Sequence, residues 1–211
     1  MGKFTPIRRA CFLLLGAGLA AMGCGKTDGT KPNGPNAPVA KTNSVWEPDP
    51  GWASEMSQTL TFDRYQISAP KSLKAVPEAT QTVGSVHVFT WRIESGADLP
   101  KALLSATIAD DKKMVDEARN NMKQTLINFT AGSTRPLNIE VKRESDVETG
   151  SLSGIPFSRF KWRGDGQPSR GLSYGGVNGD QAILFVVICF GQDSEATQGL
   201  MQAVLATLKK Q

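Results

Sequence analysis

The chain has 211 residues, and most of its formal charge of +4 comes from its N-terminus. Residues 1–23 hold three of the 24 basic residues and no acidic one, so 21 basic residues face 20 acidic ones in the remainder. This near balance gives no reason to expect binding to nucleic acid or to an anionic membrane surface.

The first 23 residues have the pattern of an export signal. Lys3, Arg8 and Arg9 precede an uncharged run of 13 residues, from Ala10 to Met22. A helix needs about 20 apolar residues to span a bilayer, so this run is too short for a transmembrane anchor and suits a signal peptide. The run ends in Ala-Met-Gly-Cys at residues 21–24, which resembles the lipobox of bacterial lipoproteins.

That resemblance implies that Cys24 receives a diacylglyceryl group and becomes the first residue of the mature chain. We therefore expect an exported lipoprotein that faces the periplasm and reaches the membrane through the lipid on Cys24. Gly25 follows the cysteine, and similarity to enterobacterial sorting favours the outer membrane over the inner one. The alternative is an ordinary secretory signal, because Ala21 and Gly23 also fit small-x-small cleavage at the same bond.

Residues 24–50 are expected to form a disordered tether. The segment from residue 25 has five Pro and three Gly and few residues that could fill a core. Its 26 residues would span roughly 28 Å as a flexible coil. Residues 51–211 are then long enough for one domain with a substantial core, on which Trp46 and Trp52 could pack.

The first half of this domain predicts three strands and a helix. Strand 59–69 has a shift in its alternation that indicates a bend or a bulge near Asp63-Arg64. Strands 83–94 and 102–109 follow, and the first of these places His87 on one face with Phe89. Asp110 or Asp111 should cap a helix that extends to about residue 129, with Gly132 as its stop signal.

The second half is rich in strands and ends in a helix. Strands 155–162 and 171–177 lead to Asn178-Gly179, which predicts a hairpin with a type I′ turn. Residues 182–190 (AILFVVICF) form a continuous apolar run, typical of a central strand covered on both faces. A helix that begins at Asp193 or Ser194 should bury a stripe of apolar residues that ends at residue 208. The positive charges of Lys209 and Lys210 would interact favourably with the negative C-terminal end of its dipole.

This order predicts an α+β fold, an α/β sandwich with a mostly antiparallel sheet of about six to seven strands and helices packed on its faces. Residues 65–70 (YQISAP), 154–157 (GIPF), Trp162, the apolar run and the closing helix occur in the order of the PsbP-like fold. The chain resembles that family over about residues 59–209, including its DcrB-type bacterial lipoproteins. The resemblance implies a non-enzymatic binding or assembly module for a protein or envelope component, and supplies no catalytic residue.

Two alternatives stay open. His87 is the only histidine and Cys189 the only thiol after Cys24, so a thiol hydrolase could use them as base and nucleophile. Cys189 lies within the apolar run, however, and a buried structural thiol is the simpler interpretation. A small-ligand carrier would instead need a pocket between sheet and helix. The sequence contains no CxxC, HExxH or EF-hand motif, so neither a metal nor another cofactor is expected.

One local charge pattern could bind a partner. Arg159, Lys161 and Arg163 alternate with Phe160 and Trp162, which places the three cations on one face of a strand. They could bind an anionic partner. Alternatively they are a solvated edge strand protected by charge, or they pair with acidic residues, namely Glu140, Glu144 and Asp146.

The lipid anchor gives the first testable prediction. Cys24→Ser should leave a folded domain but move the protein from the membrane to the soluble fraction. Each buried methylene of an attached acyl chain contributes about 0.8 kcal/mol to membrane binding, and the variant lacks all of them. Membrane fractionation measures the effect, and an unchanged distribution would contradict lipidation at Cys24.

Overall fold

The structure, a computed structural model, describes residues 44–47, 49–165 and 168–211. The strands are β1 (Ser44–Val45), β2 (Gln58–Phe62), β3 (Tyr65–Ala69), β4 (Leu73–Ala75), β5 (Gln81–Val83), β6 (Val86–Ile93), β7 (Ala102–Ala109), β8 (Glu140–Arg143), β9 (Glu148–Leu152), β10 (Ile155–Asp165), β11 (Ser169–Asn178), β12 (Gln181–Phe190) and β13 (Lys209–Lys210). The described helices are α2 (Lys112–Thr134), α3 (Ser194–Ala206) and the short 3-10 helices η2 (Pro50–Glu55), η3 (Pro77–Ala79) and η4 (Arg135–Leu137).

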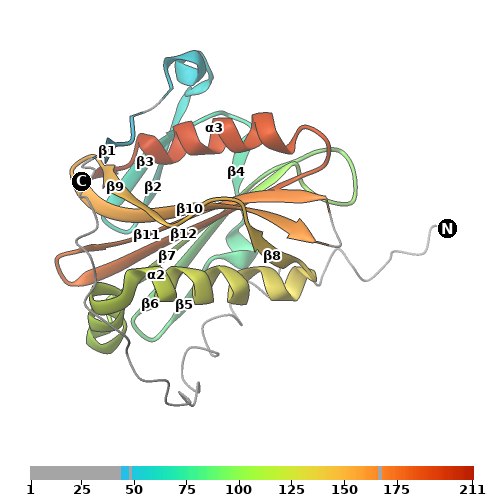
Figure 1. Cartoon of the computed structure of the whole chain (residues 1–211). Helices are drawn as coiled ribbons and strands as arrows, with labels where there is room; N and C mark the ends of the chain where they lie inside the picture. Colours follow the sequence, from blue (N-terminus) through green and yellow to red (C-terminus); the bar gives the residue numbers. More distant parts are fainter. Residues whose placement is uncertain (1–43, 48, 166–167) are drawn as a thin grey trace.

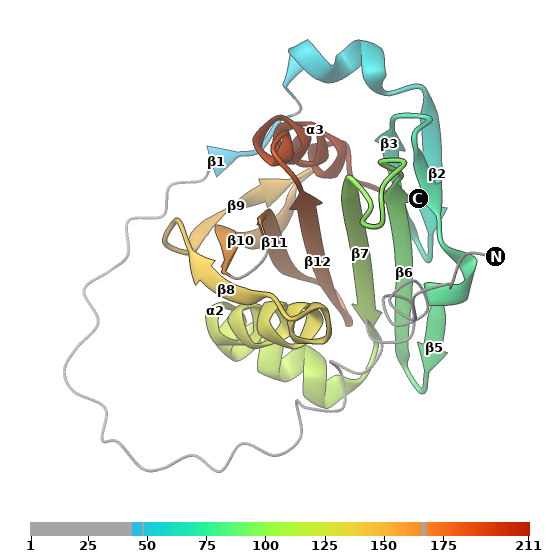
Figure 2. The same cartoon turned by 90° about the vertical axis from the view of Figure 1, so that its right-hand side faces the viewer.

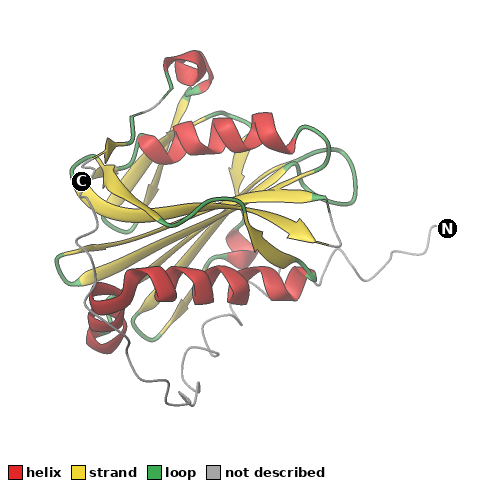
Figure 3. Cartoon of the chain, in the orientation of Figure 1, coloured by secondary structure: helices red, strands yellow, loops and turns green. Residues whose placement is uncertain are grey.

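These elements form an α/β sandwich. A ten-stranded sheet has the order β1-β9-β10-β11-β12-β7-β6-β4, with β5 also paired to β6 and β8 to β10. Helix α2 covers one face and α3 the other, as Figures 1 and 3 show. A separate sheet of β13, β3 and β2 lies on the α3 side. The predicted α+β class with helices on the sheet is confirmed.

The expected count of six to seven strands is wrong. The pairings in the described chain are antiparallel apart from β1 with β9, which is parallel, so the main sheet is mixed. Strand β9 and the short strands β1, β4 and β5 were not predicted, and these last three have only two or three residues each. A run this short cannot display the period-two alternation by which a strand is detected in a sequence.

The single strand expected over residues 59–69 is a hairpin. Phe62 pairs with Tyr65 across a two-residue turn, and Asp63 at that turn has a φ of 50°. Asp tolerates this left-handed conformation better than most residues. The shifted alternation therefore marks a chain reversal, which places both aromatic side chains in the core.

The later hairpin lies one residue further along than predicted. Asn178 pairs with Gln181, so Gly179 and Asp180 form the turn between β11 and β12. Gly179 has a φ of 63°, while Asp180 does not have a positive φ. A type I′ turn needs positive φ at both central residues, so that turn type is wrong although the hairpin is present.

Both long helices differ at their C-terminal ends from the prediction. Helix α2 begins as expected, because the Asp111 carboxylate accepts the backbone N–H of Met114 at 3.0 Å. It continues through Gly132 to Thr134. Lys209 and Lys210 lie beyond α3 and pair with β3 as strand β13, so they do not extend the helix toward its dipole.

Strand β12 lies at the centre of the core. All ten of its residues are buried. Phe185 and Val187 belong to the cluster that packs under α3, whereas Leu184, Val186 and Ile188 belong to the cluster under α2. The predicted central strand with both faces covered is confirmed.

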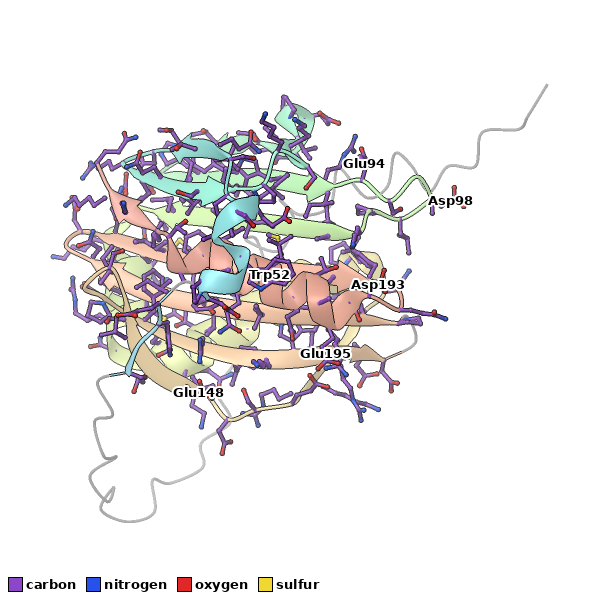
Figure 4. The ribbon with its side chains drawn as sticks, turned by 90° about the horizontal axis from the view of Figure 1, so that it is seen from above. Trp52, Glu94, Asp98, Glu148, Asp193 and Glu195 are labelled. Carbon is purple, nitrogen blue, oxygen red and sulfur yellow. The ribbon has the colours of Figure 1, made fainter. Side chains whose placement is uncertain are left out.

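The segment before β2 wraps over the domain. Trp46 is buried and its backbone N–H donates to the Ser151 carbonyl at 3.0 Å. The chain then crosses above α3 to reach β2, with Trp52 of η2 beside Gly199 (Figures 2 and 4). Residues 44–46, which lie before the expected start of the domain at residue 51, are therefore packed against the described fold.

Arg159 fastens this segment to the sheet. Its Nε donates to the Glu148 carboxylate at 3.0 Å, and its guanidinium lies 4.2 Å from the centre of the Trp46 ring. The Trp46 ring also meets Tyr174 edge to face, with ring centres 5.6 Å apart. Burial raises the pKa of Tyr174, and the nearby Arg159 charge opposes that rise. The side chain of Arg159 is only 15% exposed, so it serves packing rather than capture of a partner.

Arg159→Ala should therefore destabilise the domain by about 1–2 kcal/mol, since it removes a shielded cation–π contact and an ion pair. The melting temperature should fall by about 2–8 °C. The control is Lys161→Ala on the same face of β10, because Lys161 is exposed. Equal melting temperatures for the two variants would contradict the fastening role of Arg159.

Candidate functional site

A groove of about 640 Å³ lies between the first half of α2 and the ends of β1, β9, β10 and β11. Its floor is the face of the sheet that carries α2. Its wall consists of Ala118, Arg119 and Met122, and Val45 of β1 stands at its rim. We call this feature the α2 groove.

The floor is open because its residues are small. Ser158 pairs with Thr149 on one side and with Gly175 on the other, so the three residues form a row across the sheet. On the same face of β10, Phe160 and Trp162 fill the space below the second half of α2. The small residues in the row that contains Ser158 leave the space below the first half of α2 unfilled.

A break in α2 shapes the wall of the groove. Asn121 has φ −148° and ψ 56°, values that no α-helix contains, and its side chain accepts the N–H of Gln124 at 3.4 Å. Asn121 thus acts as the N-cap of the second half of the helix. Arg119 holds the first half in place, because it donates to Asp116 at 2.9 Å and to the Gly179 carbonyl at 3.0 Å.

Gly175 allows the wall and floor to approach each other closely, whereas its neighbour Gly176 is crowded by the adjacent strand β10. A Cβ atom on Gly175 would lie 2.7 Å from the Met122 sulfur, and one on Gly176 would lie 2.6 Å from the Pro156 carbonyl oxygen. The sequence has four glycines between residues 171 and 179. The structural role of Gly175 depends on its pairing with Ser158 and on which face α2 covers, and neither is visible in the glycine spacing.

One of two well-exposed large hydrophobic side chains in the described chain lies at this groove. Among the described residues, the large hydrophobic side chains that are well exposed are Val45, at 60%, and Val83, at 61%. Val45 is at the rim of the groove, and Val83 ends β5, beyond β6 on the opposite side of the sheet.

The structure does not bring His87 and Cys189 together. Cys189 pairs with Ala102 of β7, whereas His87 pairs with Ile108 of the same strand. Six residues of a strand separate these positions by about 20 Å. Burial raises the pKa of the Cys189 thiol to about 12, and the His87 Nδ1 lies 3.2 Å from the Thr82 hydroxyl.

The three cations on β10 do not form one surface. Arg159 is covered by Trp46, while Lys161 and Arg163 are exposed. Strand β10 lies between β11 and the pair β8 and β9, so the edge-strand interpretation is wrong. Arg159 pairs with Glu148 and not with the acidic residues that we expected.

Within residues 44–47, 49–165 and 168–211, the acidic, histidine and cysteine side chains form no group of three that could hold a metal ion. No helix in the described part of the chain is long and apolar enough to cross a membrane. Cys24 lies outside the described residues.

No protein-family model matches the sequence, and no curated protein sequence matches it. The structure is similar to cyanobacterial PsbP (CyanoP) from Synechocystis sp. PCC 6803, with a TM-score of 0.54 and 14% identity over 73% of this chain and 92% of that protein. It also matches the Ran-binding protein Mog1p from Saccharomyces cerevisiae, with a TM-score of 0.45 and 9% identity over 72% and 94% of the two chains. The similarity to CyanoP shows that this domain has a PsbP-like fold.

Proposed function

We propose that this protein is an exported, non-enzymatic binding module, held at a membrane by a lipid on Cys24 and facing the periplasm, with the outer membrane favoured. We further propose that its α2 groove binds a small apolar component of the cell envelope. The observation that carries this proposal is the groove itself, which has an apolar wall above a floor of hydroxyls and glycines. A PsbP-like fold is compatible with a binding module.

The surface favours a small ligand over a broad protein interface. Stable protein interfaces bury about 1,600 Å² in total and rely on aromatic and arginine anchors near their centre. Over the described surface, large apolar side chains are well exposed only at Val45 and Val83, which lie far apart in the sheet order. The groove, by contrast, lies within the range of about 300–1,000 Å³ that is typical of ligand pockets.

A second candidate is an anionic protein or envelope polymer that binds Lys161 and Arg163. Both side chains are exposed on β10, and no acidic side chain in the described part of the chain forms an ion pair with them. Such a partner would bind in a salt-dependent way, because exposed charges are screened.

A thiol hydrolase has the least support. A nucleophilic thiol needs a base within hydrogen-bond reach, and the pairing register keeps His87 far from Cys189. The thiol is also fully buried, which favours its protonated, unreactive form.

Photo-cross-linking in intact cells tests the groove. A photoreactive amino acid at position 45 should form a low-mass adduct with the ligand, because this side chain stands at the rim of the groove. Intact-protein mass spectrometry measures the adduct. Position 83 is the matched control, since Val83 has almost the same exposure but lies on β5. Adducts at neither position, or equally at both, would contradict ligand binding in the α2 groove.

The thiol of Cys189 gives another test, in mature protein that carries Cys24→Ser. A rise in pKa from 9.0 to about 12 lowers the thiolate fraction at pH 8 by about a thousandfold, so native protein should react very slowly with a thiol reagent. Denatured protein should react fast.

The free energy of unfolding should also fall as the pH rises from about 9 toward 12, because only the unfolded chain releases the Cys189 proton in that window. Fast labelling of the native protein at neutral pH would support the hydrolase alternative.

A further inference from the structure

We infer that the α2 groove selects single-chain amphiphiles with an anionic head group, which binds at Arg119 while the aliphatic chain lies along the groove. This inference rests on the proposed function, because it names the class of ligand that the groove would hold. Two features carry it, namely the charge at the mouth of the groove and the distribution of polar and apolar atoms along it.

Among the described side chains that line the groove, Arg119 supplies the only charge. The other lining residues are apolar, hydroxyl-bearing or glycine, so the electrostatic preference of the lining depends on one guanidinium. The Asp116 carboxylate pairs with Arg119 but does not line the groove, so a positively charged ligand would meet no complementary group within the lining itself. An anionic ligand would meet a cation that keeps its charge at every pH of biological interest.

The guanidinium is already oriented. Nη2 donates to the Gly179 carbonyl at 3.0 Å, and Nη1 donates to Asp116 at 2.9 Å. The side chains of Arg119 and Asp116 are 54% and 45% exposed, so this ion pair is weak and solvent-screened. A guanidinium has five N–H donors, and the two bonds leave donors for a ligand carboxylate or phosphate.

The body of the groove suits an aliphatic chain. Ala118, Met122 and Val177 give it apolar surface, and Val45 extends that surface to the rim. Met is flexible and adapts to irregular ligands. The helical hydrogen-bond ladder is already interrupted at Asn121, next to Met122, so this part of the wall can shift without breaking a continuous helix.

Calorimetric titration with three probes that share a twelve-carbon chain tests the inference. The probes are dodecanoate and dodecyltrimethylammonium, each below its micelle concentration, and dodecanol below its solubility limit. The protein is the whole mature chain with Cys24→Ser. Dodecanoate should bind most tightly, dodecanol more weakly, and the cationic probe weakest. High salt should reduce the advantage of dodecanoate over dodecanol.

Variants at Arg119 separate the head group from the chain. Arg119→Gln should weaken dodecanoate binding by about fivefold, the value of one partly exposed charge contact, and leave dodecanol binding unchanged. Arg119→Lys should retain most of the affinity for dodecanoate. Lys123→Gln is the matched control, because Lys123 is exposed on the same helix and does not line the groove. Melting curves establish that each variant is folded.

Two variants test whether the aliphatic chain of the probe lies in the groove. Ser158→Leu should fill the floor and weaken both dodecanoate and dodecanol. If Ser158→Leu does not fold, Val45→Asp at the rim serves instead, with Val83→Asp as its equally exposed control.

The outcomes distinguish the inference from the proposed function. Equal binding of dodecanoate and dodecanol, with no effect of Arg119→Gln, would overturn the anionic selectivity but leave the groove as an apolar binding site. If neither probe binds, or if Ser158→Leu and Val45→Asp change nothing, both the inference and aliphatic binding in the groove are overturned.

Discussion

The rest of the fold depends on the burial of strand β12. Its ten residues face α2 on one side and the α3 layer on the other. Both faces of the sheet must therefore be covered for the side chains of β12 to be buried from solvent. Each buried Leu, Ile, Val or Phe side chain on it contributes about 1.5–3 kcal/mol relative to exposure. This requirement places one helix on each face, and the segment before β2 adds a further layer across α3.

The groove arises where this coverage is incomplete. Helix α2 packs closely over β10 only where Phe160 and Trp162 meet it, and Trp162 also donates to the Ser173 hydroxyl at 3.1 Å. In the row of Ser158, the neighbouring strands β9 and β11 contribute only Thr149 and Gly175 to this face, and α2 is broken at Asn121. Water fills this open groove, and burial of its apolar lining by a ligand would release that water with a gain in free energy.

The sequence predicts the layers better than the site. The apolar run at 182–190 and the Asp111 cap are local signals, and both predictions are confirmed. The Asp63 turn was misread, because a two-residue reversal and a bulge produce the same shift of parity. Arg159 was predicted on the correct face, but its burial under Trp46 depends on contacts between residues more than a hundred positions apart. The groove could not be predicted, because it depends on where the break at Asn121 lies over β10. The sequence does not show how α2 is placed on the sheet.

The position of Val45 links the groove to the N-terminal segment of the described domain. Val45 belongs to β1, which lies within residues 24–50, the segment that the sequence predicts to be a tether, and its neighbour Trp46 is fixed by Arg159. The same short segment therefore pairs with β9 and lines the groove at its rim. The contacts that fasten Trp46 to the sheet thus also hold Val45 in place, so they help to define the shape of the groove that we propose as the binding site.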